Sequence, residues 1–365
     1  MKILHATVMQ SYSPGIFNQM RAEYQTASDA SINIDVKIYC PKNIYPSSEI
    51  IEHSTFEINK SPLRKIENWL RLRIEYYSWL KKNDSQYDVI ILRNSVHDPF
   101  LLNFIKSSKT KVLLMHHTLE SSELKSLGYL GYIRYIGDKY LGAVCISKSD
   151  GIIGVTNEII NFEKSRIKNK KINSFLYPNG IRIDYSELLL NYKSKEIELM
   201  FVASYFFDWH GLDLLLKNIK ESNEKFILHI IGEVSKKDKK SGINDERIIF
   251  HGSLNRDEII NIAQHCNVGL SSFALYRKGM NQACTLKVRE YLSLGLPVYS
   301  GHQDVFPDDF PYYKYGPPLI DNIIKFSKET ILTSRNEIRK ESSRYINKKI
   351  LLSKLFEEIK EIYKK

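Results

Sequence analysis

Residues 277–298 read RKGMNQACTLKVREYLSLGLPV, and this pattern decides how the surrounding chain folds. A polar loop comes first, and an amphipathic helix follows from about residue 285. Gly295 and Pro297 then end that helix and lead into a buried strand. A helix enclosed by a loop and a buried strand in this way is typical of a strand-helix-strand unit with a parallel sheet.

The start of this helix is a candidate anion site. Thr285 stands at the capping position, and the unpaired N–H groups of Leu286 and Lys287 would lie at the positive end of the helix. Together with the Lys287 ammonium they predict a site for a diphosphate. Glu290, one turn further on, is placed to accept two hydrogen bonds from a ribose. The alternative is an ordinary solvated amphipathic helix.

The rest of the chain repeats the same alternation of short β-branched runs and helical stretches. We therefore expect the α/β fold class, with two doubly wound domains whose parallel sheets are covered by helices on both faces. The domains would span residues 1–185 and 197–320, joined by a linker at 186–196. A charged helical tail, 321–365, would return toward the first domain. The carboxyl ends of both sheets would face a common cleft, where ligands bind in such folds.

Composition and charge limit the classes of function. The 365 residues include 43% hydrophobic and 26% charged side chains, with a formal net charge of +11, so an acidic partner is expected. No RGG, RNP-like or zinc-finger pattern is present, so nucleic acid is not expected as a partner. The four cysteines form no CxxC pair and predict buried thiols in the cytoplasm. No run of 18 apolar residues predicts a membrane-spanning helix.

Several common motifs are missing. No GxGxxG follows the first predicted strand, and neither GxxxxGK[ST], HExxH nor DxD occurs. These absences argue against a dinucleotide oxidoreductase, a P-loop NTPase and a sugar transferase with a metal-binding DxD site. No metal and no cofactor are expected.

Three segments together resemble the glycosyltransferases of family 4. They are TLKVREYLSLGLPV at 285–298, YPNGI at 177–181, and FVASYFFDWHGLD at 201–213, in the family's order and spacing. The resemblance is good from about residue 150 to 305 and weak before residue 140. It implies the GT-B fold, with two Rossmann-like domains, a nucleotide diphosphate sugar as donor (UDP- or GDP-linked), retention of anomeric configuration and no metal.

The resemblance also implies roles for single residues. Glu290 matches the second Glu of the family's Glu-x7-Glu motif, which binds the ribose, whereas the first Glu is Gln282 here. An amide can hydrogen-bond sugar hydroxyls but supplies no negative charge. Where the family places an Arg and a Lys for the diphosphate, this chain has Ser204 and His210. We expect His210 to be charged beside the diphosphate; a neutral histidine that caps the next helix is the alternative.

Further candidates lie at other predicted strand ends. Gly15, after the first strand, allows a ligand to approach the backbone, unless it marks a plain turn. His117, after the strand at 111–117, is a candidate catalytic residue facing the cleft. A metal site with its neighbour His116 is disfavoured because adjacent strand residues point to opposite faces. The remaining candidates for the donor site, or for ordinary turns, are Gly232, Gly252 and Ser253.

The stretch 64–82 combines six basic residues with Trp69 and Trp79. It fits a helix on an anionic membrane surface, or a surface helix that packs its tryptophans into the core. The expected function is transfer of a sugar to a hydroxyl of a lipid-linked glycan, in the cytoplasm and peripherally at the inner face of the membrane. The alternatives are a sugar-nucleotide epimerase or hydrolase of the same fold, and a non-catalytic partner subunit.

Overall fold

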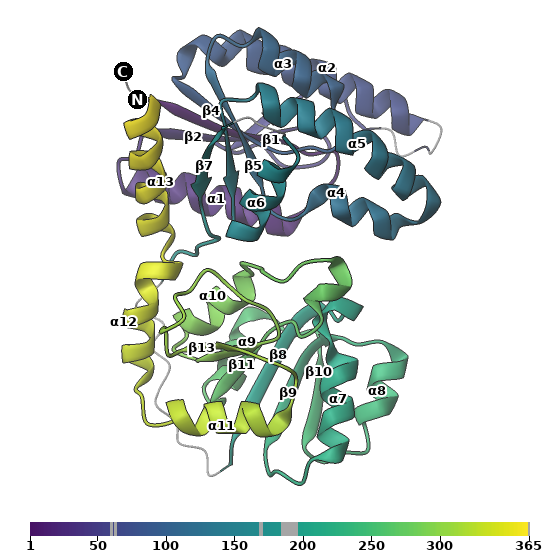
Figure 1. Ribbon diagram of the computed structural model, residues 1–365, viewed down its shortest axis with the longest axis vertical. Coiled ribbons are helices and arrows are strands. Elements are labelled where there is room, and N and C mark those ends of the chain that lie inside the picture. The colour runs from purple at the N-terminus through teal and green to yellow at the C-terminus, as the bar shows by residue number, and fades with distance from the viewer. Residues whose placement is uncertain (59–60, 62–63, 168–170, 184–195, 364–365) are drawn as a thin grey trace. The chain divides into compact units, whose positions relative to one another are not determined.

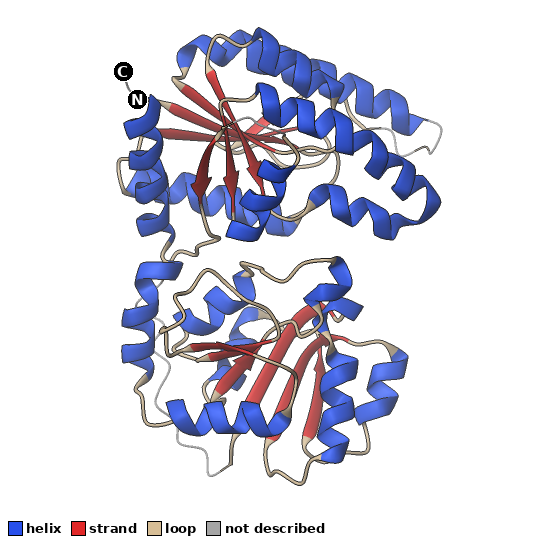
Figure 2. Ribbon diagram, viewed as in Figure 1, coloured by secondary structure: helices blue, strands red, loops and turns tan. Residues whose placement is uncertain are grey.

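The structure, a computed structural model, describes residues 1–58, 61, 64–167, 171–183 and 196–363 (Figure 1). Its contacts divide the chain into two compact units, Met1–Tyr177 with Lys348–Lys365, and Pro178–Asn347. Each unit is an α/β body with one parallel sheet (Figure 2). The predicted domain ranges 1–185 and 197–320 stay predictions. The predicted linker at 186–196 lies outside the described residues except for Glu196.

The first unit contains a seven-stranded sheet in the order β3-β2-β1-β4-β5-β6-β7, parallel throughout. Its strands are β1 (Ile3–Val8), β2 (Ile34–Cys40), β3 (Ile51–His53), β4 (Val89–Arg93), β5 (Lys111–His116), β6 (Gly151–Gly154) and β7 (Asn173–Leu176). Nearly every residue of the central strands is buried, as expected where helices cover both faces.

The helices of the first unit lie in two layers. They are α1 (Pro14–Asp29), α2 (Lys65–Asn83), α3 (Pro99–Ser107), α4 (Glu120–Glu123), α5 (Gly128–Lys148), α6 (Asn157–Ser165) and α13 (Lys348–Tyr363). One face of each of α2, α3 and α5 packs into a shared core with the even-numbered residues of β1, β4 and β5. Helix α13 packs against α1 and β7, far from it in sequence.

The second unit repeats this topology with six parallel strands in the order β10-β9-β8-β11-β12-β13. The strands are β8 (Glu198–Tyr205), β9 (Ile227–Glu233), β10 (Ile248–Gly252), β11 (Val268–Leu270), β12 (Val298–Ser300) and β13 (Tyr313–Tyr315). The helices are α7 (Leu212–Glu221), α8 (Lys236–Gly242), α9 (Arg256–Ala263), α10 (Leu286–Ser293), α11 (Ile320–Thr330) and α12 (Arg335–Ile346). Helices α7 and α11 cover one face, and α9, α10 and α12 the other.

Local signals account for many of these elements. Asn255 and Glu258 form a capping box at the start of α9, with hydrogen bonds of 2.7 and 3.0 Å, as their spacing predicts. The predicted α/β class with two doubly wound sheets is confirmed. The strands β3 and β13 and helix α8 were not predicted. The predicted tail is three helices, because the chain turns at 331–334 and at Asn347.

All four cysteines are buried thiols outside any disulfide, as predicted. Among the described residues, no helix combines the length and the hydropathy that crossing a bilayer requires. The tryptophans of α2 pack against protein: Trp79 lies beside the Tyr39 and Tyr76 rings, and Trp69 lies 6.1 Å from the Phe100 ring. The packing of Trp79 against the core agrees with the alternative, a surface helix packed into the core. Both tryptophans are nonetheless only half-buried, and Ile66, Leu70 and Ile74 of α2 are 40–74% exposed. Contact of α2 with a membrane therefore stays a prediction.

Candidate donor site

The loop after β8 carries two of the predicted donor residues. Ser204 is exposed near the end of β8, and His210 lies in a short 3₁₀ turn that leads to α7. The backbone carbonyl of His210 accepts a hydrogen bond from the N–H of Phe273, after β11. Gly211 has a φ of 68°, and a Cβ there would press on Phe273 and Ala274. Glycine thus lets the two loops lie side by side at the carboxyl edge of the sheet.

His210 is neutral. Its Nδ1 accepts a hydrogen bond of 3.0 Å from the Phe207 N–H, so the remaining proton is on Nε2. Burial and the nearby Lys287 ammonium lower the pKa of His210 to about 3. The predicted imidazolium beside a bound diphosphate stays a prediction, because an anion at this place would raise the pKa of His210 again. The ring closes the 3₁₀ turn and does not cap α7 in the way that the alternative predicts.

The N-terminus of α10 lacks the predicted side-chain cap. Thr285 occupies the N-cap position, but its hydroxyl makes no hydrogen bond to the first turn. Its Oγ1 and the Lys287 Nζ are both buried without a hydrogen-bond partner among the described residues. The first N–H groups of α10 therefore remain available to an anion, as an uncapped helix start requires.

Lys287 is the central cation of this region. Its ammonium lies 5.1 Å from the centre of the Phe201 ring on β8 and interacts electrostatically with His210 and Glu290. Burial lowers the pKa of Lys287 to about 7, while Glu290 counteracts that shift. A buried ammonium with so little negative charge nearby is expected to be strongly stabilised by an anionic ligand.

Glu290 lines a pocket of about 340 Å³ in the second unit. The pocket walls are mixed, with apolar side chains and two arginines besides the carboxylate. The residues that line the pocket together with Glu290 are Ile181, Arg182, Arg256, Ile259, Ile260, Ser293 and Leu294. Part of the Glu290 residue is exposed, but burial of its carboxylate raises the pKa, and Arg256 and Lys287 oppose that shift. A carboxylate beside a pocket of this size suits a ribose hydroxyl pair.

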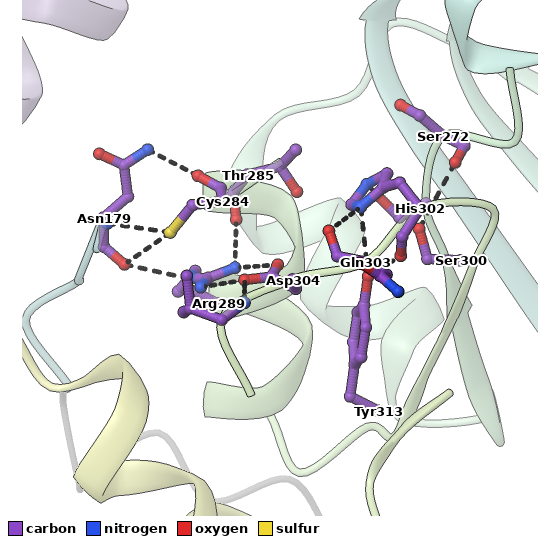
Figure 3. A network of polar contacts seen from close by, with 12 residues as sticks. Asn179, Ser272, Cys284, Thr285, Arg289, Ser300, His302, Gln303, Asp304 and Tyr313 are labelled. Carbon is purple, nitrogen blue, oxygen red and sulfur yellow. Dashed lines mark hydrogen bonds and ion pairs between the residues drawn. The ribbon is translucent and has the colours of Figure 1, made fainter. Parts of the chain in front are cut away.

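A buried ion pair that the sequence did not predict holds α10 in place (Figure 3). Arg289 and Asp304 are both fully buried, and the guanidinium donates to both carboxylate oxygens of Asp304. The Arg289 Nε also donates to the Asn179 carbonyl at 3.0 Å, and the Asn179 amide donates to the Cys284 carbonyl at 2.6 Å. The YPNGI segment and the loop before α10 are thus fastened to one buried centre.

Gln282 belongs to a second set of hydrogen-bonded polar side chains in this unit. Its amide donates to the Gln303 side chain at 3.4 Å, and the two residues form a bridge between their backbones. The Gln303 amide in turn donates a hydrogen bond of 2.9 Å to the Tyr315 hydroxyl. Next to it, the buried His302 is hydrogen-bonded to Tyr313 and has a lowered pKa because of burial. Gln282 is therefore oriented by neighbours in the second unit.

The turns after β9 and β10 hold three further predicted residues. Gly232 has a φ of 121°, and a Cβ there would overlap the carbonyl of Ala203 on β8, so packing alone requires glycine. Gly252 also has a positive φ, 70°, with open space around it. Ser253 donates a hydrogen bond of 3.0 Å to the Glu233 carboxylate and ties the two turns together.

The comparisons with known proteins agree with this architecture. In solved structures, the chain is similar to the lipopolysaccharide outer core galactosyltransferase WaaB, with a TM-score of 0.69 and 13% identity over 98% of this chain and 99% of that one. It is also similar to HepE of Anabaena in complex with UDP and glucose, with a TM-score of 0.64 and 12% identity over 98% and 99% of the two chains. The chain has the GT-B fold.

Sequence comparison points the same way. An uncharacterized glycosyltransferase of Methanocaldococcus jannaschii is 24% identical over 266 residues, 66% of this chain. The match spans 66%, just under two thirds, of that relative's length. No protein-family model matches the chain. The predicted similarity to GT-B glycosyltransferases is confirmed, and the predicted roles of single residues stay predictions.

The first unit of this GT-B chain contains the predicted His117. Its Nε2 is buried without a hydrogen-bond partner among the described residues, and burial together with Arg93 lowers its pKa well below the usual value. Neutral His117 is available to donate or accept one hydrogen bond. Gly15, near the start of α1, has no heavy atom within 4 Å of the place that a Cβ would occupy, so packing does not require glycine there.

His116, the last residue of β5 and the neighbour of His117, has a different environment. His116 Nδ1 lies 3.0 Å from Glu120 and 3.6 Å from Glu163, and Arg166 donates to Glu163 at 2.7 Å. These contacts form an ion-pair network, which raises the pKa of His116. His116, Glu120 and Glu163 also have the spacing of metal ligands, as do Glu198, His229 and Cys266 in the second unit. Neither group includes His117, although the charge of His116 contributes to the lowered pKa of His117.

Proposed function

We propose that the chain is a glycosyltransferase that moves a sugar from a nucleotide diphosphate sugar to a hydroxyl of a lipid-linked glycan. The observation that carries this proposal is the uncapped start of α10, where the Lys287 ammonium is buried without a hydrogen-bond partner in the described part of the chain. Both features favour a diphosphate. The similarity to galactosyltransferase WaaB and to HepE with bound UDP and glucose supports a nucleotide sugar as the donor.

The roles of the donor residues follow from their chemistry. The Lys287 ammonium and the first N–H groups of α10 would hold the diphosphate, and Glu290 would bind the ribose hydroxyls at the pocket. His210 would donate a hydrogen bond from its neutral Nε2–H, so the positive charge would come from Lys287. Gln282 would bind sugar hydroxyls through its amide, and Gly232, Gly252 and Ser253 would border the base.

The reaction breaks the bond between the anomeric carbon and the diphosphate oxygen, and forms one from that carbon to the acceptor oxygen. The acceptor hydroxyl gives its proton to a phosphate oxygen of the departing nucleoside diphosphate. Cationic and N–H groups around the leaving diphosphate lower the barrier because negative charge grows there in the transition state. Retention of configuration, a catalytic role for His117 and close approach of the donor to Gly15 belong to this proposal.

Incubation with radiolabelled nucleotide sugars tests the proposal. The full chain would receive UDP- or GDP-linked sugars with and without a membrane glycolipid extract, and products would be separated by chromatography. Transfer to the extract with release of nucleoside diphosphate is expected, and loss of transfer in Lys287→Met would assign it to this site. A new sugar nucleotide or free sugar formed without acceptor would instead indicate an epimerase or hydrolase. No nucleotide binding at all would indicate a non-catalytic subunit.

A further inference from the structure

Helix α5 presents an unusual outer face. Seven large apolar or aromatic side chains along it are 40–79% exposed. They are Tyr129, Leu130, Tyr132, Ile133, Ile136, Tyr140 and Val144. Single exposed apolar residues are normal, but a contiguous row of them marks an interaction surface.

The row follows the period of the helix. Tyr129, Ile133, Ile136, Tyr140 and Val144 are spaced by four, three, four and four residues, which places them on one stripe of an α-helix. We call these five residues the α5 stripe. The stripe therefore runs along about four turns of the helix.

The opposite face of α5 is firmly packed. Gly131, Asp138, Cys145 and Ile146 are buried there, and the Asp138 carboxylate accepts a hydrogen bond of 2.9 Å from Arg166. The helix also lies against α3 in the first unit (Figure 1). The stripe thus faces outward from a helix whose orientation the core fixes, so its exposure is a property of the folded unit.

The charges around the stripe are positive. Lys125, Arg134, Lys139 and Lys148 are exposed on or just before α5. At 100° per residue, Lys139 falls on one side of the stripe, and Arg134 and Lys148 fall on the other. The single acidic residue of the helix, Asp138, is buried and paired with Arg166. The outer face therefore combines apolar side chains with uncompensated positive charge.

We infer that the α5 stripe docks the first unit on an anionic lipid bilayer. The helix would lie in the plane of the interface, with the stripe between the headgroups and the basic side chains against lipid phosphates. Tyrosine suits this position because its ring is apolar and its hydroxyl is polar. A second copy of the chain fits less well, because two-fold pairing of this face would bring the same positive charges together. The inference does not depend on the donor chemistry.

Vesicle sedimentation tests this inference with the full chain. Phosphatidylcholine vesicles containing 30% phosphatidylglycerol should retain the protein at low salt and release it as salt rises, whereas pure phosphatidylcholine vesicles should not retain it. The triple variant Ile133→Ser, Ile136→Ser, Tyr140→Ser should lower retention at least tenfold. Arg134→Gln with Lys139→Gln should lower it on the anionic vesicles.

The matched control is Ile350→Ser with Ile362→Ser, two residues of α13 in the same unit that are 44% and 46% exposed. These changes should leave retention unchanged. All variants alter exposed side chains, so their melting temperatures and nucleotide binding should match those of the unchanged protein. A failure of glycosyl transfer would leave this measurement unaffected, because vesicle retention is read without substrate.

Insertion of the stripe can be measured directly. Because the four native cysteines are buried, an environment-sensitive fluorophore can be attached selectively to Tyr140→Cys, and to Ile362→Cys as the control. Emission should shift to the blue on anionic vesicles only for the α5 position. The inference is overturned if anionic vesicles do not retain the protein at low salt, or if the triple variant binds as well as the unchanged protein. Light scattering that shows a dimer dissociated by the triple variant, without vesicle retention, would assign the stripe to self-association.

Discussion

At the scale of single residues, the protonation of Lys287 links the donor site to pH. Burial sets its pKa at about 7. A bound diphosphate would raise that pKa, because it favours the ammonium. Affinity for UDP-glucose, whose diphosphate diester does not titrate near neutrality, should therefore be constant below pH 7. Above pH 7 it should fall by up to tenfold per pH unit until the bound-state pKa is reached.

Titration calorimetry between pH 6 and 9 measures this slope. Lys287→Met should bind more weakly and with no pH dependence in this range. His210→Gln is the matched control: its imidazole has a pKa of about 3 and does not titrate here, so the slope should remain. A slope that vanishes in His210→Gln and persists in Lys287→Met would transfer the cationic role to the histidine.

Glu290 supports a second prediction. Replacing it with Ala should remove hydrogen bonds to the ribose and weaken donor binding by about 1.5–3 kcal/mol, the range for hydrogen bonds to a charged group. Calorimetry with UDP and with inorganic pyrophosphate separates this effect, since only the nucleoside diphosphate carries a ribose. Equal losses for both ligands would contradict a ribose contact.

The sequence suggests functional roles for two charged residues of α10, but it does not reveal the structural role of the third, Arg289. Lys287 and Glu290 stand out because they follow a polar loop at a predicted helix start. Arg289 looks like one more surface charge, because its partner Asp304 lies 15 residues away in a loop. The low pKa of His210 cannot be predicted from the sequence for a related reason: burial and the proximity of Lys287 arise only when the loops after β8 and β11 come together.

At the scale of elements, Arg335 joins α12 to the end of α9. Its buried guanidinium donates to the carbonyls of Ala263, Gln264 and Cys266 at 3.0, 3.0 and 2.8 Å. These oxygens are among those that a helix end leaves without partners. Arg335→Ala should lower the free energy of unfolding by about 2–4 kcal/mol, because buried acceptors lose a charged donor.

Urea denaturation measures this loss. Lys340→Ala, an exposed residue of the same helix, is the control and should change stability by less than about 0.5 kcal/mol. Equal stability of the two variants would mean that water replaces the guanidinium at the end of α9.

The sequence predicts whether a segment is a helix or a strand where its hydrophobic pattern is long. It does not predict what the faces of a helix contact. The buried strands of both sheets and the capping box of α9 follow from local pattern. The tryptophans and basic residues of 64–82 suggest a membrane-facing helix, yet those tryptophans pack against protein rings. The period of α5 is equally visible in the sequence, but which of its faces meets the core depends on α3, which no local pattern reveals.

At the scale of the whole molecule, the first unit depends on the last helix of the chain. Leu352, Leu355 and Ile359 of α13 are at most 2% exposed, and Lys348 lies 3.9 Å from the buried Glu23 carboxylate. Deleting residues 348–365 would expose the apolar surface of α1 and leave Glu23 with fewer positive neighbours. The first unit should then unfold at a lower temperature, while the second unit keeps its stability.

Calorimetric melting combined with limited proteolysis distinguishes the two units. Deletion should make fragments of the first unit protease-sensitive while a fragment covering about 178–347 persists. A matched variant, Ile362→Ser, changes an exposed position of α13 and should melt as the full chain does. If the deletion lowered the melting temperature of both units equally, it would contradict the assignment of α13 to the first unit.

The path of the chain also bears on the order in which the two units can be completed. The second unit is continuous from Pro178 to Asn347, whereas the first is interrupted and resumes at Lys348. Since domains generally fold as units, the second unit contains every element that it needs once residue 347 is available, whereas the first unit cannot be complete without α13. The unit synthesised first is therefore the last to be completed. Until α13 is in place, the apolar surface of α1 that it covers stays exposed to water.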